Sequence, residues 1–208
     1  MTNRRGREDT AGRLTRAAVV DAALRVLEDR GLEGLSTRAV ADSLGVRMNT
    51  VLWHVKTKAR MLELMADAIV GEIGYAGLPS PPRQQVRELA RRYRRALLAH
   101  RDGAALVTGT YSAEPHTLHF ADRLVDALLE AGADEEQAGW TAWTVMYFLL
   151  GLVQEEQAAP DRLDDRLARA VDAGTHPALH RVAGHMRPVA FEERFTFGLE
   201  TILARLPE

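Results

Sequence analysis

Apolar residues in the N-terminal part of the chain recur at the three- and four-residue steps that are typical of one face of an α-helix. Thr15 is a plausible N-cap at the start of this pattern, and Gly31 is a plausible C-terminal glycine at its end. The pattern therefore predicts a first helix between these two residues. Its apolar face is formed by Val19, Ala22, Ala23, Val26 and Leu27.

Three further helices are expected before the first strong break in the pattern. Ser36 or Thr37 can cap a second helix that runs to about Leu44, and a third, short helix occupies roughly Arg47–His54. Thr57 can cap a fourth helix, over residues 58–73. The segment GYAGLPSPP, residues 74–82, then holds two glycines and three prolines, which marks a boundary.

The rest of the chain is again helical in its pattern. An apolar stripe follows Pro82, a short helix follows Gly103, and no segment shows the two-residue alternation of a half-buried strand. The fold class is therefore all-α. The middle of the longest helix, from Trp140 to Val153, is apolar nearly all round, which suggests burial at a subunit interface. The expected later helices cover about residues 114–132, 135–157, 161–173 and 188–206.

Composition and charge narrow the class of protein. The chain has 208 residues, 46% of them apolar, without cysteine and without an apolar run long enough for a membrane span. Met1–Arg16 is polar and basic, unlike a secretory signal, so a cytoplasmic protein is expected. Residues 1–60 carry 12 Lys/Arg and 7 Asp/Glu, against 15 and 22 in residues 61–208. A basic head suggests a polyanionic partner, although a solvated surface would give the same counts.

The segment TRAVADSLGVRMNTVLWHV, from Thr37 to Val55, has the spacing of a helix-turn-helix. A small residue, Ala41, stands where two helices would cross, and Gly45 four positions later allows a left-handed turn. Val51 follows six positions after that glycine as an inward anchor. The alternative is any pair of packed helices.

The side chains away from these anchors suit DNA. Asn can pair with adenine, Arg with guanine, and the Thr methyl group can contact a thymine methyl group. The N-terminus of the preceding helix suits a phosphate. Arg4, Arg5 and Arg7 could follow the minor groove, or form a solubilising tail. The candidate DNA-binding residues are Thr37, Arg38, Arg47, Met48, Asn49, Thr50, Trp53, His54 and Lys58.

Other functions find weaker support in the sequence. His116 and His119 are three residues apart, and His176 and His180 are four apart, with His185 nearby, which is metal-ligand spacing on a helix. His176 precedes a proline, so a helix there is doubtful, and solvated histidines are the favoured interpretation. No catalytic motif is found, so we expect no enzyme, no metal and no cofactor. A helical adaptor, or a metal-responsive regulator using the histidine pairs, is the alternative.

The stretch from Leu14 to about Ala68, carried by GLEGLSTRAVADSLGV and TVLWHVKTK, resembles the tetracycline-repressor (TetR) family. Three later segments, LLAHRDGAALVTGT, GLVQEEQ and FTFGLETIL, resemble the effector-binding half of tetracycline-responsive members, in the same order. The resemblance implies nine or ten helices, a three-helix DNA-binding head and dimerisation through the last long helices. One departure is Leu52, where the family usually has a phosphate-contacting tyrosine.

The resemblance also implies a domain division and a pocket. We expect a flexible basic arm in residues 1–10, a helix-turn-helix domain in 11–60 and a ligand-binding and dimerisation domain in 61–208. Val107, Gly74 and Leu89 stand where the family's magnesium–tetracycline site has two histidines and an asparagine. Val107 cannot bind a hard cation, so the expected effector is another bulky, mainly apolar molecule.

The candidate ligand-binding residues come partly from the resemblance and partly from the aromatic character of the long helix. Each candidate has an alternative interpretation. The aliphatic residues could be ordinary core, the aromatic residues could belong to a dimer interface, and Glu155 could simply be exposed to water. They are Leu89, Tyr93, Val107, Thr110, Tyr111, Trp143, Tyr147 and Glu155. The expected protein is a homodimeric repressor of a palindromic double-stranded DNA operator, with a small-molecule effector and no membrane association.

Overall fold

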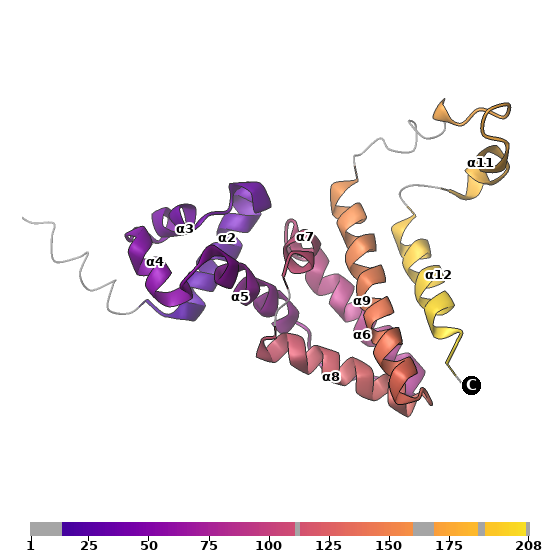
Figure 1. Cartoon of the computed structure of the whole chain (residues 1–208), viewed down its shortest axis with the longest axis horizontal. Coiled ribbons are helices and arrows are strands. Elements are labelled where there is room, and N and C mark those ends of the chain that lie inside the picture. The colour runs from indigo at the N-terminus through magenta and orange to yellow at the C-terminus, as the bar shows by residue number, and fades with distance from the viewer. Residues whose placement is uncertain (1–13, 111–112, 160–168, 187–189, 207–208) are drawn as a thin grey trace, which may run out of the picture.

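The computed structural model describes residues 14–110, 113–159, 169–186 and 190–206, and within these ranges it contains helices and no strands. The all-α prediction is confirmed. The expected arm, residues 1–10 with Arg4, Arg5 and Arg7, lies outside the described residues. Four helices form the N-terminal part of the molecule (Figure 1): α2 (Arg16–Gly34), α3 (Thr37–Leu44), α4 (Met48–Val55) and α5 (Lys58–Gly71).

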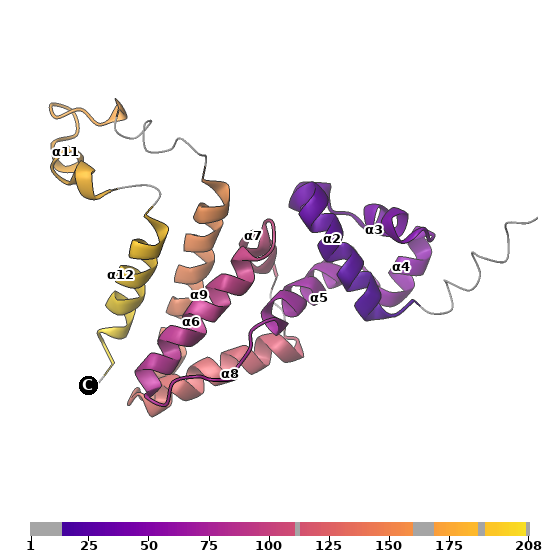
Figure 2. The same cartoon turned by 180° about the vertical axis from the view of Figure 1, so that it is seen from behind.

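The remaining helices form an elongated body beside this head. Seen from either side, α9 and α12 run next to each other at the edge of the body farthest from α3 and α4 (Figure 2). Helix α5 packs against α2 and α4 and also against α6, α7 and α8, so it joins the two parts. The body contains α6 (Pro82–Leu98), α7 (Gly103–Thr108), α8 (Pro115–Glu130), α9 (Glu135–Ala158), α11 (Pro177–Val182), the 3-10 turn η1 (Ala183–His185) and α12 (Phe191–Leu203).

Side-chain caps fix the starts of the helices in the head. The hydroxyl groups of Thr15, Ser36 and Thr57 each accept a backbone N–H three residues later, at 3.0–3.1 Å. These bonds satisfy amides that have no partner inside the helix. Gly31 has a φ of 69°, which ends the regular part of α2 where the sequence predicts an end.

One continuous core runs through head and body. It extends from Val19 in α2, through Met65 in α5, to Leu89 in α6 and Phe195 in α12, all at most 1% exposed. In α9, Val145 lies on the face that is buried in this core, whereas Trp140 and Tyr147 of the same helix are exposed. The burial of apolar area is the main stabilising contribution to this arrangement.

The C-terminal segments differ from the sequence prediction. The helix expected over 161–173 lies mostly outside the described residues. Residues 171–176 form a turn, because the Asp172 carboxylate accepts hydrogen bonds from the N–H groups of Gly174 and Thr175. Helix α11 begins directly after His176, where the following proline is accepted at the first position of a helix. The last helix ends at Leu203, three residues before the predicted end. The guanidinium of Arg83 donates a hydrogen bond to the carbonyl of Leu203.

Candidate DNA-binding surface and effector cavity

The turn between α3 and α4 has the geometry that its sequence predicts. Gly45 has a φ of 65°, in the left-handed region that favours glycine. The N–H of Gly45 donates to the Asp42 carbonyl at 3.1 Å, and the N–H of Val46 donates to the Ala41 carbonyl at 3.0 Å. Val51 is completely buried beneath this turn. The turn therefore holds α4 in a fixed position against α3.

None of the nine candidate DNA-binding side chains is buried by this packing. Thr37, Thr50 and His54 are partly buried, and the other six are exposed: Arg38, Arg47, Met48, Asn49, Trp53 and Lys58. The indole of Trp53 is 71% exposed, which is a large apolar area to leave in water unless a partner covers it. A helix with exposed Arg, Asn and aromatic side chains has the chemistry to contact base edges and phosphates.

The C-terminal end of α4 carries a further cation that the structure places beside Trp53. Lys56 has a φ of 67°, and its Nζ lies 5.6 Å from the centre of the Trp53 ring. His54 meets the same ring edge-on at a centroid distance of 4.8 Å. Arg16, at the start of α2, donates from Nε to the His54 carbonyl at 3.3 Å. Sequence reasoning missed Arg16, because this contact joins residues 38 positions apart.

A cavity of about 480 Å³ opens between α5 and the body helices α6, α7, α8 and α9. This volume is within the range of small-molecule pockets. Its lining is mainly apolar and aromatic, with a few hydroxyl groups and one amide. The lining residues are Ala66, Val70, Tyr93, Val107, Thr108, Thr110, Thr117, Phe120, Trp143, Met146, Tyr147, Leu150, Gly151 and Gln154.

Five of the eight candidate ligand-binding residues line this cavity together: Tyr93, Val107, Thr110, Trp143 and Tyr147. The other three do not. Leu89 is completely buried in the core outside the lining, and Glu155 is exposed with its carboxylate 3.7 Å from Arg194 Nη1. Tyr111 lies outside the described residues.

Tyr93 is the polar group buried most deeply in this lining. Its side chain is 1% exposed, its ring stacks on Phe120 at 4.7 Å, and its hydroxyl group has no hydrogen-bond partner among the described residues. Burial raises the pKa of the Tyr93 hydroxyl above its usual value, because the phenolate would lose its hydration. A buried hydroxyl without a partner costs about 1–3 kcal/mol, which a suitable ligand could recover.

The opposite wall is aromatic and partly open to solvent. Trp143 and Tyr147, one turn apart on α9, stack at a centroid distance of 5.4 Å and are 50% and 63% exposed. Sequence reasoning missed the contributions of α5 and α8, which include Val70 and Phe120. Their apolar periodicity is the same as that of core residues, so no sequence signal distinguishes a cavity wall from a packed core.

The wall from α5 is tied to α8 by a buried carboxylate. Asp67 is 7% exposed, and its Oδ1 accepts hydrogen bonds from the backbone N–H and the hydroxyl of Thr117, at 2.8 and 2.9 Å. Thr117 lies in the first turn of α8, where a helix leaves amides without internal partners. Asp67 therefore connects the helix that reaches the head to a residue that lines the cavity.

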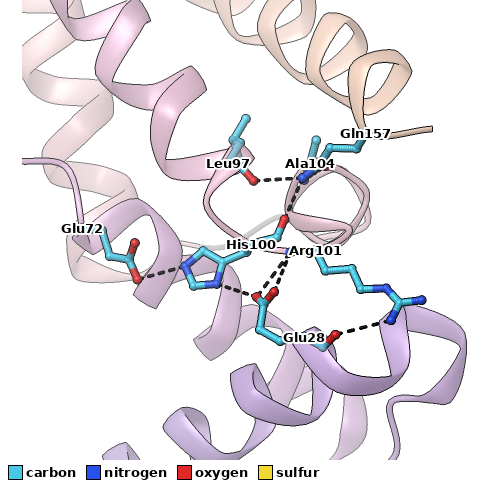
Figure 3. Close-up of polar contacts among 7 residues, drawn as sticks. All are labelled: Glu28, Glu72, Leu97, His100, Arg101, Ala104 and Gln157. Atoms are coloured by element: carbon cyan, nitrogen blue, oxygen red, sulfur yellow. Dashed lines mark hydrogen bonds and ion pairs between the residues drawn. The ribbon is translucent and has the colours of Figure 1, made fainter. Parts of the chain in front are cut away.

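The loop between α6 and α7 makes a second connection between body and head (Figure 3). The imidazole of His100 bridges Glu28 on α2, at 3.0 Å from Nδ1, and Glu72 after α5, at 2.9 Å from Nε2. The backbone N–H of Arg101 also donates to the Glu28 carboxylate. From the other side, the amide of Gln157 on α9 donates to the His100 carbonyl at 2.6 Å. The loop is thus held by α2, α5 and α9 together.

The exposed face of α9 continues onto α12 as a shallow groove of about 590 Å³. Trp140 on α9 is 67% exposed in this groove, and Phe197 on the neighbouring α12 is 76% exposed. Large aromatic side chains exposed to this extent are typical of an interaction surface.

The histidine pairs have different neighbours in the structure. Within the described residues, no group of three or more His, Cys, Asp or Glu side chains could hold a metal ion. The ring of His119 stacks edge-on against Tyr75, and His176 Nδ1 lies 3.0 Å from the Thr175 hydroxyl. Among the described helices, none is long and apolar enough to cross a bilayer.

Comparison with known proteins agrees with this architecture. The family model of bacterial regulatory proteins of the tetR family matches residues 19–65, and that of the tetracyclin repressor-like C-terminal domain matches residues 78–207. The chain is similar to the tetracycline repressor protein class E of Escherichia coli, with 34% identity over 92% of this chain and 90% of that protein.

Two solved structures extend the agreement to the fold. A possible TetR family transcriptional regulator from Streptomyces coelicolor A3(2) is 34% identical, with a TM-score of 0.82 over 91% of this chain and 97% of its own. ActR from the same species, in complex with actinorhodin, is 27% identical, with a TM-score of 0.83 over 92% and 95% of the two chains. The chain described here belongs to the TetR family of DNA-binding, ligand-responsive transcriptional regulators.

Proposed function

We propose that this protein is a cytoplasmic homodimeric repressor that binds a palindromic operator and is released by a bulky, mainly apolar small molecule. The observation that carries the proposal is the position of α5. Ala66 and Val70 of this helix line the cavity, and the same helix packs against α2 and α4 of the head. A molecule that displaces α5 would therefore also displace the DNA-binding helix.

The head supplies the DNA-binding chemistry of the proposal. Asn49 and Arg47 would contact base edges in the major groove, while Lys58 and Arg38 would contact phosphates. The exposure of these four side chains supports these roles. Leu52 replaces the family's usual tyrosine and cannot make that residue's phosphate contact. Lys56, whose ammonium group lies beside Trp53, would make a phosphate contact in its place.

The dimer would form through the exposed face of α9 and α12, with a second copy of the chain covering Trp140 and Phe197. Burying two large aromatic side chains per copy is favourable, by about 1.5–3 kcal/mol for each side chain. A two-fold axis through this face would present two heads to successive major grooves, about 34–36 Å apart.

The effector site of the proposal is the cavity, and its chemistry argues against magnesium–tetracycline. Among the described residues, the cavity lining contains no carboxylate and no imidazole, which are the side chains that a hard divalent cation prefers. Similarity to ActR, solved in complex with actinorhodin, supports a small-molecule effector in this family fold. For release, the effector must bind the DNA-incompetent arrangement more tightly than the competent one.

Electrophoretic mobility shift tests the DNA-binding part of the proposal. Fragments upstream of and adjacent to the gene are mixed with wild type, Asn49→Ala and the control Gln84→Ala, an exposed amide on α6 in the body. We expect a specific shift that Asn49→Ala weakens by roughly 5- to 150-fold, corresponding to about 1–3 kcal/mol for one base contact, and that Gln84→Ala leaves unchanged.

Salt separates base contacts from phosphate contacts in the same assay. Binding should weaken with salt, and Lys58→Ala should reduce the slope of log K against log salt by about one. Equal affinity of wild type and Asn49→Ala would contradict the proposed role of α4. If random-sequence selection yields no preferred palindrome, the repressor proposal fails.

A further inference from the structure

Within the described residues, the hydroxyl group of Tyr93 is a buried donor in the cavity lining that has no acceptor. The hydroxyl groups of Thr108 and Thr110 donate to the carbonyls of Ala104 and Val107, at 2.8 and 2.9 Å. The third threonine in the lining donates to Asp67 at 2.9 Å. Tyr93 alone among these hydroxyl residues is buried without any partner in the described part of the chain. The oxygen itself is covered in this structure, so a ligand that pairs with it must first displace the side chains around it.

The charge of the lining restricts the ligand further. None of the fourteen lining residues is Asp, Glu, Lys, Arg or His. The buried carboxylate of Asp67, which follows the lining residue Ala66 in sequence, already accepts two hydrogen bonds from Thr117. A charged group placed against the buried wall of Tyr93 and Phe120 would lose its hydration without gaining an opposite charge from the lining, which is strongly unfavourable. This wall thus selects uncharged groups.

The shape of the ligand follows from two aromatic pairs in the lining. Tyr93 and Phe120 stack with an interplanar angle of 19°, and Trp143 and Tyr147 stack with an angle of 27°. Both pairs contribute to the same cavity, together with the flexible thioether side chain of Met146. Aromatic rings favour offset stacking or edge contacts with other aromatic rings, so these walls suit a flat ring system.

On these observations, and on the proposed function of the cavity as the effector site, we infer that the effector is an uncharged, planar, polycyclic aromatic molecule with a carbonyl group that accepts a hydrogen bond from the Tyr93 hydroxyl. The phenol remains protonated and so remains a donor, because burial opposes formation of the phenolate. The side-chain amide of Gln154 lies in the same lining and offers a second polar contact.

Three probes of nearly the same shape test this inference by equilibrium dialysis. Fluorenone is flat, neutral and carries one ring carbonyl, fluorene lacks the carbonyl, and fluorenone-2-carboxylate adds a negative charge. Each is measured with wild type, Tyr93→Phe and Tyr75→Phe. Tyr75 is a matched control, because it lies outside the cavity lining and contacts His119 instead. Circular dichroism checks that each variant is folded.

We expect wild type and Tyr75→Phe to bind fluorenone about 2- to 12-fold more tightly than fluorene, the range for one net hydrogen bond. Tyr93→Phe should abolish this preference while keeping its affinity for fluorene. The carboxylate should bind wild type at least about tenfold more weakly than fluorenone. Equal binding of fluorene and fluorenone to wild type, a preference that survives in Tyr93→Phe, or no binding of either neutral probe would overturn the inference.

The operator assay judges the proposed function separately, because it needs no effector. A specific, Asn49-dependent DNA shift together with no carbonyl preference would refute the inference about Tyr93 and leave the repressor proposal standing. Absence of a specific DNA shift, together with a Tyr93-dependent preference for the carbonyl probe, would support the inference about Tyr93 and refute the proposed regulatory role.

Discussion

The side-chain amide of Gln157, in the last turn of α9, donates a hydrogen bond of 2.6 Å to the backbone carbonyl of His100. The same amide donates to the Leu97 carbonyl at 3.2 Å, and its oxygen accepts from the N–H of Ala104 at 3.2 Å. One side chain thus satisfies three backbone groups at the end of α6 and the start of α7. These groups belong to the loop whose imidazole contacts the head (Figure 3).

Gln157→Met should destabilise the protein, because it leaves the N–H of Ala104 without its partner and removes one donor each from the carbonyls of Leu97 and His100, which keep the N–H groups of His100 and Gly103. The expected loss is about 1–3 kcal/mol in the free energy of unfolding. Urea denaturation followed by circular dichroism measures it. The control is Gln84→Met, at an exposed position on α6, which should change the free energy by less than about 0.5 kcal/mol. Equal effects of the two substitutions would contradict the role of Gln157.

Gly198 on α12 should be sensitive to a single added methyl group. A Cβ atom at this position would overlap the ring of Phe148 on α9. Gly198→Ala should therefore separate the two helices and cost about 1–3 kcal/mol of stability, despite the better helix propensity of alanine. The double variant with Phe148→Leu should recover part of this loss in a double-mutant cycle. Additive effects would show that the two positions do not interact.

The ion pair between Arg60 and Glu114 makes a pH-dependent contribution to stability. The Arg60 guanidinium lowers the pKa of Glu114 below its usual value through a direct hydrogen bond, and Glu63 shares the same guanidinium. A carboxyl whose pKa is lower in the folded state stabilises the fold above its unfolded pKa, near 4.3, and loses this effect as the pH falls through the folded value.

Glu114→Gln should therefore lower the free energy of unfolding at pH 7 by at most about 1 kcal/mol, since the pair is partly exposed and screened. The difference from wild type should shrink as the pH falls from about 5 to below the lowered pKa. Urea denaturation at a series of pH values checks this, with Glu33→Gln at an exposed position as control. A difference that grows on acidification would have the wrong sign and refute the assignment.

The exposed aromatic face of α9 and α12 should decide the oligomeric state. Phe197→Glu places a charge where the proposed dimer buries a ring, so the variant should be monomeric by light scattering at micromolar concentrations. Its operator affinity should fall by more than tenfold, because two heads no longer bind together. Leu118→Glu, at a residue 56% exposed on α8, should keep the wild-type mass. A dimeric Phe197→Glu would place the interface elsewhere.

Local chemistry made the head predictable. The caps at Thr15 and Thr57 and the left-handed turn at Gly45 depend on residues at most five positions apart, and all three are confirmed. Of the two candidates for the second cap, Ser36 and Thr37, the structure selects Ser36. The helix α11 was not predicted, because its proline at the first position is read equally well as a helix breaker. Short-range signals therefore fixed helix ends well where a capping side chain was present.

The cavity was only partly predictable. Tyr93 and Trp143 were identified by resemblance and by aromatic character, and the structure brings them to one cavity. Val70 and Phe120 have the same spacing as core residues, and Glu155 was placed near a ligand although its carboxylate faces Arg194 at the surface. Whether an apolar residue fills space or borders it depends on how helices pack, and residue spacing carries no information about this.

The sequence by itself determined the helical fold class, the helix-turn-helix and the family, because periodicity, capping and turn residues act over short distances along the chain. Only the tertiary structure decided that the hydroxyl of Tyr93 is buried without a partner in the part of the chain that the structure describes, and that His100 lies between Glu28 and Glu72. Those relationships join residues 28 or more positions apart, or depend on the absence of a neighbour, and both are settled by packing in three dimensions.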